Sequence, residues 1–345
     1  TLPTNGGNIR SLTLNNVKTD SLDLSALNAL TTLSLVNLSG TDLTLPSSNT
    51  GITTLTLDNL DFDSINLSGM TGLTTINLKN MPKGFHVDFG NNTTTTTLDM
   101  TGSDLSGFAD GQIEGSLSKL ETLTLNNTNI STFSSERIKD ISTLTKININ
   151  NNTALESVEF KDDGNALKQI LVRNCPDLRE ITIEDNGKVE WISIDNNKKL
   201  TTEGLRLAEE YEKLCMLEVG NTGLTGTLKI PKFDTTPRLY TNQTDPSVNT
   251  YTPQFTMENT DIEIIDMSNA GTLALLYAPD CKNLSKITGT ENLTELQGLD
   301  VTNAPNLHYL DLPNLKEGGY NYIGVSGTDL AYLNIPKSDR SHVVL

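Results

Sequence analysis

The sequence predicts a mostly β solenoid of the α/β class, with about 15 stacked coils, parallel strands and few short helices. Three observations predict it. A leucine-rich motif returns about every 22 residues, and a second strand-like motif lies about halfway between its occurrences. Only 35% of the 345 residues are hydrophobic and 5% are aromatic, so a thin core of Leu and Ile, repeated many times, is expected instead of a bulky one.

The first motif reads LxxLxLxN, and its positions are numbered one to eight below. Alternation of Leu or Ile with Thr, Ser, Asn and Asp is typical of a half-buried strand. Positions four and six are therefore expected to point inward, and positions three and five outward. Because the period is nearly constant, parallel strands are expected to stack coil upon coil. The motif begins at Ile9, Leu30, Ile52, Leu73, Thr95, Leu120, Leu144, Leu167, Val189 and Leu214.

The second motif gives each coil another extended side. It has the same alternation, for example in 62–67, 155–160 and 178–183. Both series share one period, so two stacks of parallel strands are expected to enclose one narrow interior.

An Asn closes the first motif in nine coils. Where a strand turns, its backbone groups lose their partners, and an Asn amide supplies both a donor and an acceptor. We therefore predict a structural ladder of inward Asn side chains. The alternative is that Asn only favours the turn and that its side chain faces outward. The nine residues are Asn16, Asn37, Asn59, Asn80, Asn127, Asn151, Asn174, Asn196 and Asn221.

Three stretches interrupt the repeat. The segment 201–214 has a Thr cap, early Glu residues and apolar residues three and four apart, which predicts a short helix, and 134–141 is a weaker case. The segment from about 231 to 261 contains four prolines, which predict an irregular insertion. The repeat is expected to resume at Ile262 within one solenoid domain spanning residues 1–345. Its later positions are Leu273, Leu284, Leu296, Leu307, Tyr320 and Leu330.

With these motifs the chain resembles the leucine-rich-repeat family, and within it the short-repeat bacterial cell-surface group of internalin-like and adhesin-type proteins. The resemblance implies an arc with a parallel sheet on its concave side, which binds proteins or glycans without catalysis or a cofactor. The usual family motif is LxxLxLxxN, so its Asn is ninth, whereas here it is eighth. The alternative fold is a right-handed parallel β-helix, whose coils have similar length.

The outward positions change character along the chain. In the N-terminal coils, position three is a short hydroxyl residue, as at Thr32, Thr54 and Thr75. Farther along it becomes large and apolar, and exposed apolar groups tend to mark partner surfaces. We predict that these residues form a binding patch, unless the 231–261 insertion covers them. They are Trp191, Met216, Ile264, Tyr309 and Tyr332.

Charge and composition exclude several functions. With 25 Lys and Arg against 43 Asp and Glu, the net charge of −18 argues against a nucleic-acid partner. The sequence has no run of about 18 apolar residues, so no membrane-spanning helix is predicted. Cys175, Cys215 and Cys281 form no metal-ligand pattern and are expected to be buried thiols.

Catalytic and metal motifs are not recognisable either. The residues His86, His308 and His342 are scattered, so no metal or catalytic site is predicted from them. Calcium binding around Asp162 and Asp163 lacks a calcium-loop pattern. A glycan-active enzyme using strand carboxylates is the weaker alternative; its candidates are Asp99, Asp195, Asp266 and Asp311.

The expected function is therefore a secreted or cell-surface binding module for an extracellular protein or glycan, involved in adhesion. Because the chain starts at Thr1 without a Met, a removed signal or anchor is expected. A structural spacer that projects another domain from the cell is the main alternative. Neither end of the repeat has an evident cap, so either an end-to-end homodimer or a longer parent chain is expected.

Overall fold

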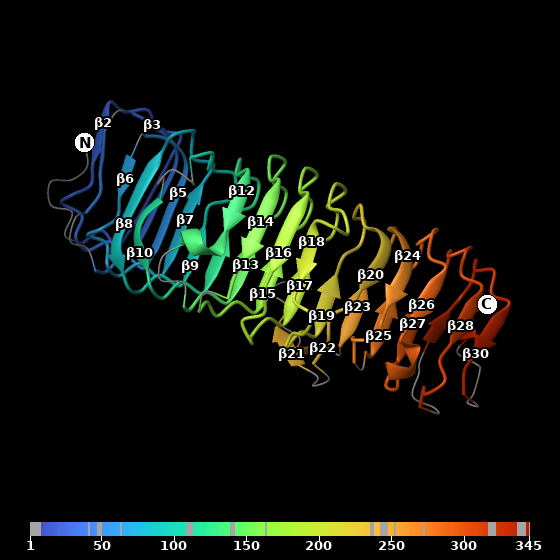
Figure 1. The fold of residues 1–345 in the computed structure, drawn as a ribbon. Helices are drawn as coiled ribbons and strands as arrows, with labels where there is room; N and C mark the ends of the chain where they lie inside the picture. The colour runs from blue at the N-terminus through green and yellow to red at the C-terminus, as the bar shows by residue number, and fades with distance from the viewer. Residues whose placement is uncertain are drawn as a thin grey trace. The chain divides into compact units, whose positions relative to one another are not determined.

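The structure, a computed structural model, describes residues 8–40, 42–46, 50–62, 64–107, 113–138, 142–162, 164–234, 238–241, 248–251, 253–271, 273–316, 322–336 and 343–344. The chain forms a parallel-strand β-solenoid, as the sequence predicts (Figure 1). It has about 13 turns instead of the expected 15, and almost no helix. It divides into two compact units. Unit 1 comprises Thr1–Leu155 and Asp163–Leu167, and unit 2 comprises Glu156–Asp162 and Lys168–Leu345. Tyr320, His342 and Asp163 lie outside the described residues.

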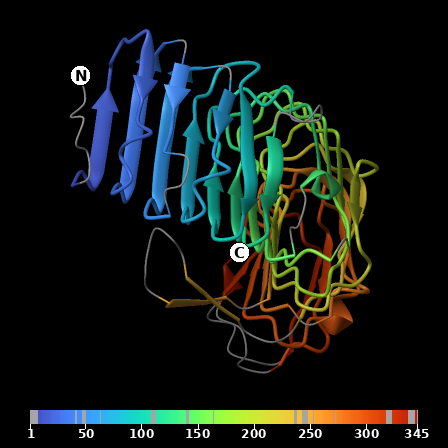
Figure 2. The same cartoon turned by 90° about the vertical axis from the view of Figure 1, so that its left-hand side faces the viewer.

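In unit 1 the first motif forms a main series of parallel strands, whose blue N-terminal members lie side by side in Figure 2. These strands are β1 (Ser11–Asn15), β3 (Thr32–Ser39), β5 (Thr54–Asp61), β7 (Thr75–Lys79), β9 (Thr97–Asp99), β11 (Thr122–Thr124) and β13 (Lys146–Asn148). The second motif forms β2 (Ser21–Asp23), β4 (Asp42–Thr44), β6 (Ser64–Asn66), β8 (His86–Asn92), β10 (Ile113–Leu117) and β12 (Thr132–Ser134). Parallel pairing joins β2 to β4, and β8 to both β6 and β10.

In unit 2 the main series is β15 (Gln169–Leu171), β17 (Trp191–Ser193), β19 (Met216–Glu218), β23 (Gln254–Thr256), β25 (Leu275–Tyr277), β27 (Gly298–Asp300), β29 (Tyr322–Gly324) and β31 (Val343–Val344). The second series is β14 (Ser157–Phe160), β16 (Glu180–Ile183), β18 (Leu205–Leu207), β20 (Thr225–Lys229), β24 (Asp261–Asp266), β26 (Lys286–Thr288), β28 (Tyr309–Asp311) and β30 (Tyr332–Asn334). Adjacent main strands pair in parallel.

The interior of both units is filled by positions four and six. No surface is exposed at Leu33 and Leu35 in unit 1 or at Leu276 and Leu299 in unit 2. The residues next to each of them along its strand face outward. Each buried Leu or Ile removes apolar area from water. Because these inward residues are repeated in every coil, together they supply much of the stability that a globular core would give.

The inward Asn ladder is a wrong prediction. Position eight has a positive φ in every described coil, between 48° and 79°. It is Asn or Asp in most coils and glycine in two, at Gly102 and Gly327. Asn tolerates this left-handed backbone better than other non-glycine residues do, which explains its recurrence. The predicted Asn residues are exposed, except for Asn221, which is half-buried. Bonds between them do occur on the surface, as from Asn59 Nδ2 to Asn37 Oδ1 at 2.8 Å.

Position nine is the inward residue at this turn, which is also where the leucine-rich family motif has its Asn. Its side chains are buried and range from apolar to polar. In this position lie Leu38, Leu60, Met81, Ser103, Thr128 and Asn152 in unit 1, and Cys175, Asn197, Thr222, Thr260, Cys281 and Ala304 in unit 2. The polar members other than Thr260 bind backbone groups of the turn; Asn152 Nδ2, for example, donates to the Leu125 carbonyl at 2.9 Å. All three cysteines are buried and free, as predicted.

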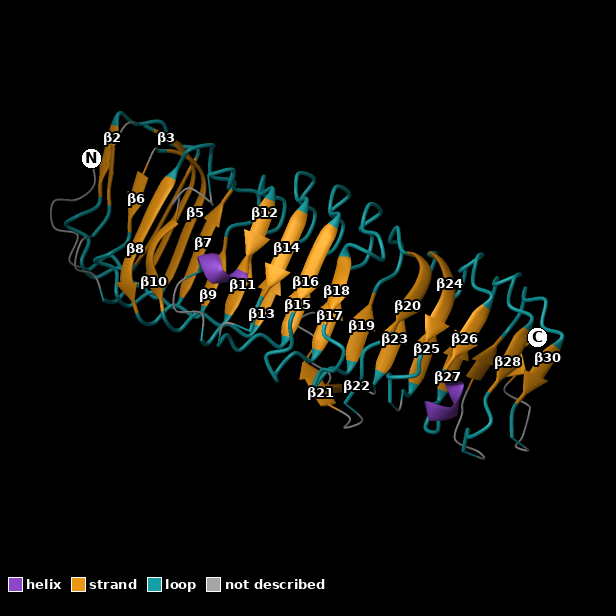
Figure 3. Ribbon diagram, viewed as in Figure 1, coloured by secondary structure: helices purple, strands orange, loops and turns teal. Residues whose placement is uncertain are grey.

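The predicted helix at 201–214 is also wrong. Leu205–Leu207 forms β18, which pairs with Ile181 and Ile183 of β16. A Cβ at Gly204 would lie 1.9 Å from the Arg179 carbonyl oxygen, so this coil approaches the previous one as closely as only glycine permits. Pairing with that coil thus overrides the local helical pattern. The described helical turns are the 3₁₀ segments η2 (Ser135–Arg137) and η3 (Thr290–Asn292), purple in Figure 3.

The irregular insertion ends earlier than the expected limit near 261. An antiparallel hairpin forms from β21 (Arg238–Thr241) and β22 (Val248–Tyr251). By Gln254 the chain has returned to the main series, where Phe255 is fully buried between Leu217 and Leu276. The alternation from Gln254 to Met257 was obscured in the sequence by the four prolines around it.

Candidate functional site

The outward face of the main strands in unit 2 carries a cluster of one aromatic and several charged side chains. Trp191 on β17 lies opposite Met216 on β19, and Ser193 lies opposite Glu218. Ile192 and Leu217 between them point inward and are fully buried. Because strands of one sheet are about 4.8 Å apart, this register brings the outward side chains of successive coils into contact.

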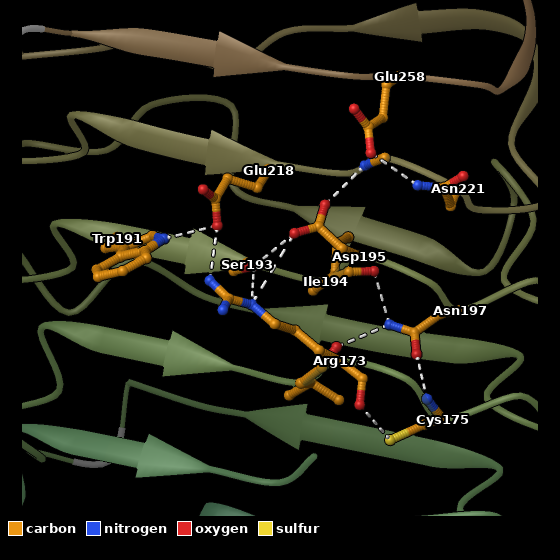
Figure 4. A network of polar contacts seen from close by, with 12 residues as sticks. Arg173, Cys175, Trp191, Ser193, Ile194, Asp195, Asn197, Glu218, Asn221 and Glu258 are labelled. Carbon is orange, nitrogen blue, oxygen red and sulfur yellow. Dashed lines mark hydrogen bonds and ion pairs between the residues drawn. The ribbon is translucent and has the colours of Figure 1, made fainter. Parts of the chain in front are cut away.

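Arg173, just after β15, joins the cluster (Figure 4). Its guanidinium donates to Glu218 Oε2 at 2.8 Å and to Ser193 Oγ at 2.5 Å, and its Cζ lies 5.5 Å from the centre of the Trp191 ring. The indole N–H of Trp191 donates to the same Glu218 oxygen at 3.1 Å. The cluster thus contains a cation–π contact and two charge-assisted hydrogen bonds that converge on one carboxylate.

Asp195 is a second carboxylate beside this guanidinium. It accepts hydrogen bonds from Ser193 Oγ at 3.0 Å and the Gly220 N–H at 2.8 Å, and it lies 3.9 Å from Arg173 Nε. Burial, followed by the negative charge of Glu218, raises the pKa of Asp195 to about 6. One guanidinium is therefore shared by two acids, and one of these acids changes its charge in the mildly acidic range.

Buried position-nine residues hold the backbone beneath the cluster. Asn197 Nδ2 donates to the carbonyls of Val172 and Ile194, both at 2.7 Å, and Asn197 Oδ1 accepts from the Cys175 N–H at 2.8 Å (Figure 4). These bonds fix the chain on both sides of Arg173. The guanidinium is thus presented from a turn with satisfied backbone groups.

The structure separates the five residues predicted as one patch. Trp191 and Met216 are neighbours on the main face, but Met216 is 1% exposed and packs with Cys215 against the half-buried Trp191. The other three, Ile264, Tyr309 and Tyr332, lie on β24, β28 and β30 of the second series. The prediction of a single patch is thus wrong. The later repeat starts recur about every 11 residues, so alternate starts belong to the second series and not to the main one. The alternative prediction, that the insertion covers these residues, concerns side chains that lie outside the described residues.

The second series has its own aromatic pair. The rings of Tyr309 and Tyr332 are stacked, with centroids 4.6 Å apart and an interplanar angle of 7°. They lie opposite each other in register and are 54% and 45% exposed. Tyr309 donates from its hydroxyl to Asp311 Oδ2 at 3.2 Å.

The sequence patterns missed a group near the C-terminal end of the main face. Tyr277 lies opposite Asp300, and the Tyr322 hydroxyl lies 3.5 Å from Asp300 Oδ2. A Cβ on Gly324 would lie 2.3 Å from that hydroxyl, so the Tyr322 ring lies over this glycine. Counting positions three and five from Leu273, Leu296 and Tyr320 would have found the group, had those starts been assigned to the main series.

The candidate catalytic carboxylates do not come together. Asp99 lies on main strand β9 and binds Lys79 at 2.8 Å, whereas Asp266 and Asp311 lie on second-series strands β24 and β28. Of the histidines in the described chain, His86 is on β8 and His308 contacts the Asp329 carbonyl. Within the described residues, no three His, Cys, Asp or Glu side chains could hold a metal ion, and no helix is long and apolar enough to cross a membrane.

Solved structures similar to this chain include leucine-rich-repeat proteins. The ectodomain of the Arabidopsis receptor kinase HAESA, solved with an IDA peptide hormone, is 16% identical over 97% of this chain and 67% of its own, with a TM-score of 0.37. YopM from Yersinia enterocolitica is 14% identical over 97% and 91%, with a TM-score of 0.32. A Leptospira interrogans leucine-rich-repeat protein is 13% identical over 95% and 92%, with a TM-score of 0.29. No family model and no curated protein matches the sequence.

Proposed function

We propose that the chain is a non-catalytic binding module of the leucine-rich-repeat type, belonging to the bacterial cell-surface group and secreted or displayed outside the cell. It recognises an extracellular protein or glycan through the outward face of the main strands of unit 2. A stacked solenoid suits this role because its outward residues vary without disturbing the interior.

The observation that carries this proposal is the cluster around Trp191. The indole is half-buried against Met216, oriented by its hydrogen bond to Glu218 and flanked by the Arg173 guanidinium. Trp and Arg bury much area in interfaces, and here their positions are fixed before a partner arrives, which lowers the entropic cost of binding.

A glycan array and a panel of purified extracellular proteins test the proposal. Wild type is expected to bind a ligand that Trp191→Ala binds at least about tenfold more weakly, the scale of an interface hot spot. Tyr309→Ala, on the second series, is the matched control and should retain binding. Equal binding by wild type and Trp191→Ala would contradict this site. If no ligand binds wild type, a structural spacer is the better description.

A further inference from the structure

The main face of unit 2 combines aromatic rings with carboxylates at a second place. Tyr277 on β25, Asp300 on β27 and Tyr322 on β29 are neighbours on its outward side, about two strand spacings across. Their neighbours along the chain, Leu276, Leu299 and Ile323, are buried. Because side chains alternate along a strand, Tyr277, Asp300 and Tyr322 therefore lie on the solvent side. Tyr322 is 38% exposed.

Arg173 shows which chemical group this kind of arrangement holds. At the Trp191 cluster, the occupant between an aromatic ring and a carboxylate is a guanidinium of the chain itself, bound at 2.8 Å to Glu218. The group of Tyr277, Asp300 and Tyr322 offers the same two elements, a ring face and a carboxylate. Asp300 Oδ1 accepts two hydrogen bonds from Thr302, whereas Oδ2 has the Tyr322 hydroxyl at 3.5 Å.

The charge around this group is negative. The outward residues of β19, β23, β25, β27 and β29 include no Lys or Arg; they are Met216, Glu218, Gln254, Thr256, Leu275, Tyr277, Gly298, Asp300, Tyr322 and Gly324. Glu258 and Asp280 add two carboxylates where strands β23 and β25 turn. Burial, followed by the charges of Asp300, Glu258 and Asp280, raises the pKa of Tyr277, and burial followed by Asp300 raises that of Tyr322.

We propose that Tyr277, Asp300 and Tyr322 bind an arginine side chain of a basic, extended segment of a partner protein. Arginine fits better than lysine because its planar guanidinium stacks on a ring while its N–H groups donate to Asp300 Oδ2. The inference rests on the proposed function, since it names the chemistry of a partner for the same strand face.

Fluorescence anisotropy with defined peptides tests this inference. The probe is a fluorescein-labelled peptide of alternating arginine and serine, compared with peptides that carry lysine or glutamine in place of arginine. We expect the arginine peptide to bind, the lysine peptide to bind more weakly and the glutamine peptide not to bind. Binding should weaken with added salt, because the contacts are charged.

Variants of the chain locate the site. Asp300→Asn and Tyr322→Ala should each weaken binding of the arginine peptide about tenfold, equivalent to about 1.4 kcal/mol, whereas Tyr322→Phe keeps the ring and should retain most of it. Glu263→Gln is the matched control, because it removes one negative charge from an exposed position of second-series strand β24. Urea unfolding of each variant checks that it is folded.

Two results would overturn the inference. One is equal loss in Glu263→Gln and Asp300→Asn, which would mean that the net charge of −18 attracts any polycation. The other is a folded wild type that does not bind the arginine peptide. If ligand binding that depends on Trp191 persists on the arrays in either case, the proposed function stands and only the arginine site is lost.

Discussion

The main strands of the two units present different faces over the same kind of interior. In unit 1, position three is occupied in register by Thr32, Thr54, Thr75 and Thr97. In unit 2, the corresponding positions include Trp191, Met216 and Tyr322. The inward positions are apolar in both, for example Leu98 and Met100 in unit 1 and Leu217 and Val219 in unit 2.

This difference shows how a solenoid separates stability from recognition. Neighbouring coils are joined by inward side chains and backbone pairing, so a change at an outward position affects only its own surroundings. Short hydroxyl side chains provide β propensity and a polar surface. The larger outward residues of unit 2 are not needed for stacking, which makes them the better candidates for function.

Position nine extends the comparison into the interior and gives the largest expected effect. Both units have apolar and polar residues at this position: Leu60 in unit 1 makes no side-chain hydrogen bond to the turn, whereas Asn197 in unit 2, like Asn152 in unit 1, bonds buried backbone groups, in its case through three hydrogen bonds. Replacing Asn197 with Leu leaves those groups unpaired, so we expect a loss of about 3 kcal/mol or more in the free energy of unfolding. Urea denaturation measures this loss.

Asn196→Gly is the control for that substitution. Asn196 is exposed at position eight with φ of 61°, which glycine adopts without strain, so its change should be within about 0.5 kcal/mol. Equal stability of Asn197→Leu and wild type would show that coils with a polar residue at position nine do not depend on its hydrogen bonds.

Asp195 in unit 2 and Asp99 in unit 1 should change the free energy of unfolding with pH in opposite directions. The pKa of Asp195 in unit 2 is raised from 3.8 to about 6, so its stabilising contribution is full below about pH 3.8 and is lost as the pH rises through 6. Asp195→Asn removes the buried charge and should increase stability at pH 8 by about 1 to 3 kcal/mol. Near pH 4 the two proteins should be equally stable.

Asp99 in unit 1 provides the opposite case. Burial acts to raise its pKa, but hydrogen bonds from Lys79 and Thr101 outweigh burial and lower it. Its contribution is therefore present above pH 3.8 and lost as the pH falls through the folded pKa, so Asp99→Asn should destabilise the protein at pH 7. Unfolding curves measured from pH 4 to pH 8 would contradict this contrast if both variants shifted in the same direction.

The interior could be predicted from the sequence because its signal is periodic. Apolar residues, mostly Leu and Ile in the N-terminal coils, recur at positions four and six, and one register places all of them inward. The helix at 201–214 could not be excluded, because its alternative, pairing of β18 with β16, depends on contacts 24 residues away. Local patterns do not contain that information.

The candidate site was predictable only in part. Trp191 stood out as a large outward residue, but its partners Arg173 and Glu218 come from neighbouring coils and are ordinary charged residues in the sequence. The turn was misinterpreted for a similar reason. The recurrence of Asn at position eight reflects a backbone conformation, while the buried side chain of position nine varies from Leu to Asn and so shows no pattern.

The smallest expected effect is on the hydroxyl face of unit 1. Substituting Val for Thr75 keeps a β-branched side chain between Thr54 and Thr97, so the free energy of unfolding should change by no more than about 0.5 kcal/mol. Binding of the arginine peptide should also be unchanged, because the proposed site is in unit 2. Urea unfolding and anisotropy on the same preparation measure both quantities. A loss of several kcal/mol would mean that this hydroxyl is structural, and a loss of peptide binding would mean that recognition extends over both faces.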